Sequence, residues 1–134
     1  MKRYLSAVSA VALLAAPLAA ADLETFLEFP KDTPPGNLAI GPDGRMFMSV
    51  HEFYGPELRD VEVMPDGSTK PYPTEEWARA PDDDGDGLRG VLGLRADRTG
   101  VLWMLDGQGE GQTGRVVGWN TNTEELHAIY YVGQ

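Results

Sequence analysis

Alternating aspartates in the run from Asp82 to Gly87 form the most distinctive set of potential ligands in this sequence. The run reads DDDGDG and offers carboxylates at Asp82, Asp84 and Asp86. Calcium is bound in proteins by several carboxylate and carbonyl oxygens, and glycine allows the sharp turn between them. An EF-hand loop starting at Asp82 needs an acidic twelfth residue, which here is Gly93, so an EF-hand is excluded. Two interpretations stay open: a partial calcium site or a solvated acidic loop.

His51 is the side chain best suited to proton transfer, because an unperturbed histidine titrates close to neutral pH. It follows an alternating apolar run and precedes Glu52. The alternative interpretation is a histidine at a strand end that bonds to the backbone. Since the chain has two histidines and no cysteine, a zinc site built from these residue types lacks ligands.

Two similar series of short strands must position these residues. In each series, alternating apolar residues are separated by turns rich in Gly, Pro, Asp and Asn. Gly44 and Gly100 occupy matching turns 56 residues apart, and Val61 and Val116 occupy matching third strands 55 residues apart. The predicted strands are residues 23–29, 38–40, 45–50, 60–64, 69–72, 91–95, 101–106, 115–120 and 125–132. A repeat of this length that holds four short strands is typical of a propeller blade.

The sequence therefore predicts an all-β fold, a partial β-propeller with blades at residues 36–73 and 89–132. Residues 30–36 are expected to form a loop, because adjacent prolines do not join the centre of a sheet. Thr74 is expected to cap a single helical turn at residues 74–78. A propeller closes with about 4–8 blades, so two blades leave apolar faces open. We expect further blades of a longer protein, or self-association, to cover them.

The blade prediction places three further candidate site residues. In a propeller the first strand of each blade lines a central channel, and ligands bind at its mouth. Asn37 and Arg89 are placed at the start of these strands and are predicted to contact a small ligand. Asp106 ends the strand that reads WMLD and is predicted either to act as a catalytic carboxylate or to stabilise the turn before Gly107.

Residues 1–21 have the pattern of a secretory signal peptide. Lys2 and Arg3 precede an apolar run, and small residues at 19–21 predict cleavage before Asp22. The run is shorter than the ~20 residues that a membrane helix needs. The net charge is −10, and loss of two basic residues with the leader makes it −12. Such a chain is expected to be secreted, extracellular or periplasmic, and not to bind nucleic acid or anionic membranes.

Four motifs at blade spacing resemble the major royal jelly protein/Yellow family. They are Pro56-x-x-Arg59, Pro65-Asp66-Gly67 followed by Pro71-Tyr72-Pro73, Val91-Leu92-Gly93 through Ala96-Asp97, and Trp103-Met104-Leu105-Asp106-Gly107. The resemblance extends from Gly36 to Tyr131 and implies a secreted six-bladed propeller of which this chain matches the N-terminal third. Family members are linked to dopachrome conversion, to binding of small amines or sterols, or to nutrition. They share no single catalytic constellation.

Three functional hypotheses follow. The first is a Yellow-like protein that binds a small organic ligand and isomerises it, as in dopachrome conversion, with His51 or a carboxylate as the base; it requires no cofactor. The second is a hydrolase similar to gluconolactonase-type propellers, which requires Ca²⁺ as a Lewis acid. The third is a truncated product or a secreted binding module without turnover. Chelation of calcium separates the first two hypotheses, because it abolishes only the hydrolase activity.

Overall fold

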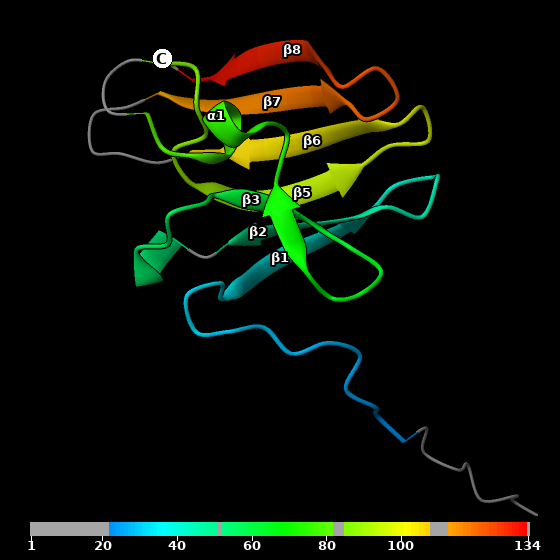
Figure 1. Cartoon of the computed structure of the whole chain (residues 1–134). Helices are drawn as coiled ribbons and strands as arrows, with labels where there is room; N and C mark the ends of the chain where they lie inside the picture. The colour runs from blue at the N-terminus through cyan, green and yellow to red at the C-terminus, as the bar shows by residue number, and fades with distance from the viewer. Residues whose placement is uncertain (1–21, 51, 82–84, 108–112, 134) are drawn as a thin grey trace, which may run out of the picture.

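The chain folds into two four-stranded antiparallel sheets (Figure 1). The computed structural model describes residues 22–50, 52–81, 85–107 and 113–133. Among these residues, no helix is long and apolar enough to cross a membrane. The two sheets confirm the predicted all-β class. The predicted signal peptide lies outside the described residues.

The first sheet is a meander in which each strand pairs with the next along the chain. Its strands are β1 (Pro35–Ile40), β2 (Met46–Val50), β3 (Asp60–Val63) and β4 (Thr69–Pro71), in the order β1-β2-β3-β4. Both Pro-Asp-Gly runs form the tight turns between strands, and their glycines have positive φ, 86° at Gly44 and 83° at Gly67. Glycine is favoured there because it has no Cβ. A short 3₁₀ helix, η1 (Glu52–Tyr54), follows β2.

The second sheet repeats this arrangement after a connection that carries the helical turn α1 (Glu75–Ala78). Its strands are β5 (Val91–Ala96), β6 (Val101–Asp106), β7 (Gly114–Asn120) and β8 (Glu125–Val132), in the order β5-β6-β7-β8. The hydroxyl of Thr74 accepts a hydrogen bond from the Trp77 amide, so the predicted cap of α1 is confirmed.

Strand register shows that the two sheets are repeats of each other. Phe47 pairs with Glu62 in the first sheet as Trp103 pairs with Gly118 in the second, a constant offset of 56 residues. The same offset relates Gly44 to Gly100. Val61 therefore matches Val117, and its predicted match with Val116 was wrong by one residue. The error matters because a shift of one residue moves a side chain to the opposite face of the sheet.

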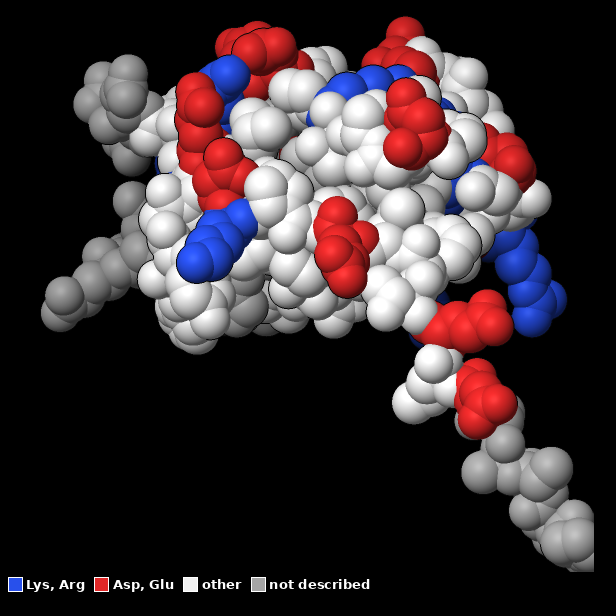
Figure 2. All heavy atoms as spheres, turned by 60° about the horizontal axis from the view of Figure 1, so that its bottom comes forward, with Lys and Arg blue, Asp and Glu red and all other residues white. Residues whose placement is uncertain are grey.

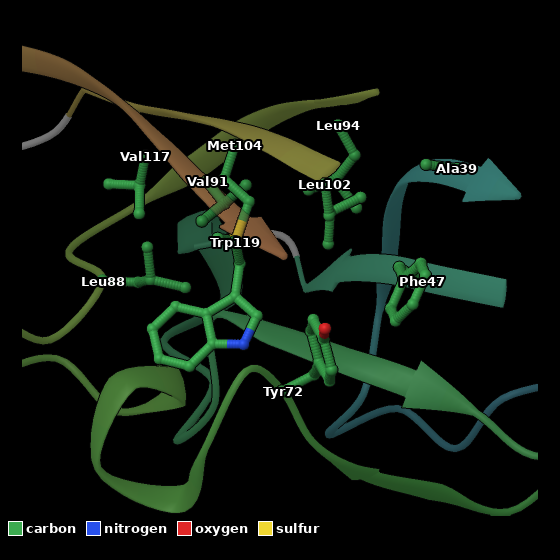
Figure 3. Packing of buried hydrophobic residues seen from close by; sticks show 10 residues of the cluster. All are labelled: Ala39, Phe47, Tyr72, Leu88, Val91, Leu94, Leu102, Met104, Val117 and Trp119. Atoms are coloured by element: carbon green, nitrogen blue, oxygen red, sulfur yellow. The ribbon is translucent and has the colours of Figure 1, made fainter. Parts of the chain in front are cut away.

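The main core fills the space between the two sheets. Phe47 and Tyr72 of the first half pack against a larger group from the second half, which includes Leu102, Met104 and Trp119. Figure 3 shows these side chains, which come from both halves of the chain and point toward one another. The sheets approach most closely where β5 lies against β1 and β2. Trp77 of α1 packs against this core, with its ring 5.5 Å from that of Trp119.

The outward faces of the two sheets differ in how far they are covered by other residues. On the first sheet Met48, Val50, Val61 and Val63 are buried under Leu27 and Phe29 of the N-terminal segment. On the second sheet, Leu105, Val116 and Tyr130 lie in one row of the strand register, and the ring of Trp103 stacks on that of Tyr130. Leu105 is 44% exposed and Tyr130 is 59% exposed. We call Trp103, Leu105, Val116 and Tyr130 the open face.

Two predictions in the N-terminal part were wrong. Residues 23–29 do not form a strand, because no neighbouring strand pairs with them; they are extended and contribute Leu27 and Phe29 to the apolar cover of the first sheet. The loop predicted for residues 30–36 ends earlier, since β1 already begins at Pro35. β1 is an edge strand, where the missing N–H of proline is tolerated.

Candidate functional site

A buried ion pair lies where β6 ends and β7 begins. Asp106 and Arg115 are partners in the strand register, and Arg115 Nε donates to Asp106 Oδ2 at 2.8 Å. The two residues are only 2% and 4% exposed. The other carboxylate oxygen, Oδ1, accepts hydrogen bonds from the backbone N–H groups of Arg89 at 2.9 Å and Gly90 at 2.8 Å. Asp106 therefore holds the segment that leads into β5.

Arg115 holds the same segment from its other side. Its Nη2 donates to the carbonyl oxygens of Gly87 at 2.6 Å and Asp86 at 3.2 Å, and its guanidinium lies 5.9 Å from the ring centroid of Trp77. A charged hydrogen-bonded pair of this kind is strong because both ions are desolvated and well oriented. The pair fixes residues 86–90 against the second sheet.

Arg89 is the candidate ligand-binding residue that this arrangement presents. Its backbone is held on both sides, by the N–H bond to Asp106 and by a bond from Arg59 Nε to its carbonyl oxygen at 2.8 Å. Its half-buried side chain makes a long hydrogen bond, 3.4 Å, to the carbonyl oxygen of Gly85. A fixed backbone with a weakly bound guanidinium can offer a positive charge to an anionic or carbonyl oxygen.

Asn37 does not occupy the position that matches Arg89. It is the third residue of β1, exposed, and lies in an irregular step of the β1–β2 register, whereas Arg89 precedes β5 by two residues. The Asn37 backbone N–H donates to Ser49 Oγ at 2.8 Å. Asn37 on β1 and Arg89 before β5 belong to neighbouring parts of the fold, because β1 and β5 lie against each other.

The sequence predicted Asp106 either as a catalytic carboxylate or as a residue that stabilises the turn before Gly107. In the structure its carboxylate binds Arg115 and the segment that leads into β5. Its side chain is buried and accepts hydrogen bonds from Arg115, Arg89 and Gly90, so it holds the backbone of Arg89 in place. His51, Asp82 and Asp84 lie outside the described residues. Asp86 is exposed, and within the described part of the chain no three acidic or histidine side chains are grouped to hold a metal ion. The calcium site remains a prediction.

A second charged cluster, absent from the sequence predictions, ties the two sheets together at the opposite end of β2. Arg45 makes two hydrogen bonds to Glu62, Nε to Oε1 and Nη2 to Oε2, both 2.8 Å. Its Nη1 reaches the turn between β7 and β8, where it contacts Glu124 Oε1 at 2.7 Å and the Thr121 carbonyl at 2.9 Å. Hydrogen bonds from Arg45 lower the pKa of Glu62, and burial raises the pKa of Tyr72, which donates to Glu124.

Asp60 is a buried carboxyl group that was not predicted from the sequence. It is completely buried in β3, and its Oδ1 accepts the N–H of Val61 at 3.1 Å, while Oδ2 has no hydrogen-bond partner among the described residues. Desolvation raises the pKa of this carboxyl well above its ordinary value. The available signal was weak: Asp60 begins a strand that reads DVEV, in which two acidic residues alternate with valine.

Asp60→Asn is expected to gain stability relative to the wild type as pH rises. The folded state keeps its proton above the unfolded pKa of about 3.9, so the wild type loses stability from there upward through the folded pKa. The difference in unfolding free energy should grow by at most about 1.4 kcal/mol per pH unit. Urea unfolding between pH 4 and 8 measures it.

Asp66→Asn is the matched control for this experiment. Hydrogen bonds from Ser68 lower the pKa of Asp66, so stability from that carboxylate is present above its unfolded pKa and is lost as the pH falls. Between pH 4 and 8 this contribution is already complete, so the difference curve of Asp66→Asn should stay nearly flat there and change only below about pH 4. A difference curve for Asp60→Asn that stays flat between pH 4 and 8 would show that Asp60 ionises normally.

Neither a protein-family model nor a curated protein sequence matches this chain. The geometry of the two sheets and of the residues around Arg89 is therefore what supports a functional proposal.

Proposed function

We propose that this chain supplies two neighbouring blades of a secreted β-propeller, similar to the Yellow family, that binds a small organic ligand and isomerises it by proton transfer. The observation that carries the proposal is the 56-residue repeat of strand register in two meanders that pack face to face. Close approach of β5 to β1 and β2 is what a radial arrangement of blades requires, since first strands line the axis.

The open face supports the same proposal. Phe47, completely buried between the sheets, matches Trp103 by the 56-residue offset. The face through which the first sheet packs on the second is thus the face that the second sheet leaves exposed. Apolar surface repeated in this way favours packing of a further sheet of the same kind. Secretion is supported by the leader pattern of residues 1–21.

The ligand is placed at the end of the sheets where Arg89 is held by Asp106 and Arg59. An arginine fixed at its backbone can orient a carbonyl or carboxylate oxygen, and polarising that oxygen favours removal of a proton from a neighbouring carbon. Figure 2 brings forward the lower side of Figure 1, where β1 lies. On this face acidic and basic side chains are interspersed, and neither sign of charge forms a single continuous patch. This charge distribution fits a small ligand better than a polyion.

Two variants test the proposal, with loss of dopachrome absorbance as the activity assay. Arg89→Ala should reduce the rate at least tenfold and leave the melting temperature nearly unchanged. Leu105→Arg places a charge on the open face; if another sheet packs there, it should cost more than about 2 kcal/mol of stability and reduce activity with it.

Arg98→Ala is the control, because Arg98 is an exposed arginine in the turn between β5 and β6. It should change neither activity nor stability. Full stability of the Leu105→Arg protein would contradict the packing of a further sheet. A rate that is insensitive to Arg89→Ala, or absent in the wild type, would contradict the ligand assignment.

A further inference from the structure

A pocket lies at the end of the first sheet opposite Arg89. It is formed between the N-terminal segment, the β1–β2 turn and the start of the β3–β4 turn, and its volume is about 560 Å³. Pockets for small ligands are typically ~300–1,000 Å³ and mostly apolar. The apolar part of its lining is Phe26, Leu27, Met46, Val63, Met64 and Pro65. We call it the turn pocket.

The charged groups that line the turn pocket all have hydrogen-bond partners within the protein. Arg45 is paired with Glu62 through two hydrogen bonds, and Glu62 also binds Lys70 Nζ at 2.8 Å. The carboxylate of Asp43 accepts the backbone N–H of Arg45 at 3.1 Å. An anionic ligand would have to displace Glu62 from Arg45 or enter without a partner, and either step is costly. A cationic ligand could pair with Asp43, but this carboxylate is exposed, and exposed ion pairs contribute little. The pocket therefore favours a ligand without net charge.

The apolar residues indicate the rest of the ligand's chemistry. Phe26 is 78% exposed although its ring lines the pocket, so a bound apolar molecule would remove that ring from water. Met46 and Met64 have flexible thioether side chains that adapt to irregular shapes and contact aromatic rings favourably. We propose that the turn pocket binds a neutral, predominantly apolar small molecule. This inference does not depend on the proposed function, because the pocket shares no described residue with the Arg89 site.

Fluorescence titration of the full chain with N-phenyl-1-naphthylamine, a neutral apolar probe, tests the proposal. We expect saturable binding of one probe per chain. Phe26→Ser should weaken this binding at least tenfold, because it removes the exposed aromatic wall. Met64→Glu, which introduces a charge without a partner, should weaken it at least as much. The anionic probe 1-anilinonaphthalene-8-sulfonate should bind more weakly than the neutral one.

Tyr130→Ser is the matched control, because Tyr130 is an exposed aromatic residue on the open face, which also could attract an apolar probe. It should change the affinity less than twofold, and circular dichroism should show that all three variants keep their strands. Binding that is lost in Tyr130→Ser but kept in both pocket variants would assign the probe to the open face and overturn the proposal. Absence of saturable binding, or tighter binding of the anionic probe, would also overturn it.

Discussion

Replacing Asp106 with alanine is expected to lower the free energy of unfolding by about 3–5 kcal/mol, because it leaves the buried Arg115 without its counter-ion. Arg115 is 4% exposed, so water cannot compensate the lost bond. The backbone N–H groups of Arg89 and Gly90 lose their acceptor as well. Since total stabilities are only about 5–15 kcal/mol, the variant should be partly unfolded at 37 °C.

Urea unfolding followed by tryptophan fluorescence measures this loss. Glu57→Ala is the control, because it removes an ion pair with Arg79 in which both side chains are exposed, and surface pairs contribute little. The unfolding midpoint of this control should stay close to that of the wild type. If Asp106→Ala loses less than about 1 kcal/mol, Arg115 must have another arrangement in solution.

The repeat supplies a second variant that separates the lost charge from the lost hydrogen bonds. Val50 occupies the position in the first sheet that matches Asp106, and Arg59 matches Arg115. Arg59 is half-buried and donates to two backbone carbonyl oxygens, those of Arg89 and Pro56. Asp106→Val combined with Arg115→Leu should therefore recover part of the stability lost in Asp106→Ala, because an apolar pair leaves no buried charge. Failure to recover would assign the loss mainly to the backbone groups that lose their partners, the N–H groups of Arg89 and Gly90 and the carbonyl oxygens of Asp86 and Gly87.

The strands could be predicted from the sequence because each turn between them is determined by a few neighbouring residues. Gly44 and Gly67 require positive φ, and apolar residues alternate on either side of them. Residues 23–29 alternate in the same way, but their strand prediction was wrong because a strand also needs a neighbour, and pairing is not local information. The offset for Val61 was wrong by one residue for a related reason: only the strand register fixes which residues are opposite.

The charged residues of the site were harder to predict than the strands. Arg45 and Glu124 are 79 residues apart in sequence and meet because the two sheets pack together. Asp106 was predicted as a site residue because it ends a strand, but its burial depends on Arg115 and on the segment before β5. Asp60 is completely buried in β3, and the alternating DVEV run was only a weak local signal of it. These contacts join residues that are far apart in the sequence, so local sequence patterns do not predict them.

Arg45→Ala is expected to cost about 2–4 kcal/mol, the second largest effect of a single substitution. The guanidinium joins Glu62 in the first sheet to Glu124 and the Thr121 carbonyl in the second, and it lies over the rings of Phe47 and Tyr72 at 5.1 and 5.3 Å. Its removal leaves Glu62, 5% exposed, with Lys70 as its remaining ion-pair partner. Both the ion pairs and the packing of the two sheets are therefore weakened.

Hydrogen exchange and urea unfolding at pH 7 measure the effect. Exchange should accelerate in β3 and in the β7–β8 turn, which Arg45 joins. Lys70→Ala is the matched control: Lys70 binds the same carboxylate oxygen of Glu62, but its side chain is 51% exposed, so its loss should cost at most about 1 kcal/mol. Equal losses in the two variants would show that Arg45 acts only as a charge near Glu62 and does not join the sheets.

Acid titration of the Arg45→Ala protein supplies a further readout of the same contact. In the wild type the pKa of Glu62 is lowered chiefly by its hydrogen bonds to Arg45. The stability that this carboxylate contributes is therefore present above its unfolded pKa, about 4.3, and is lost as the pH falls through the folded value. Arg45→Ala removes most of that contribution, so the two proteins should converge in stability at low pH. A constant difference between them down to about pH 2 would mean that packing against Phe47 and Tyr72, rather than the ion pair, accounts for the loss.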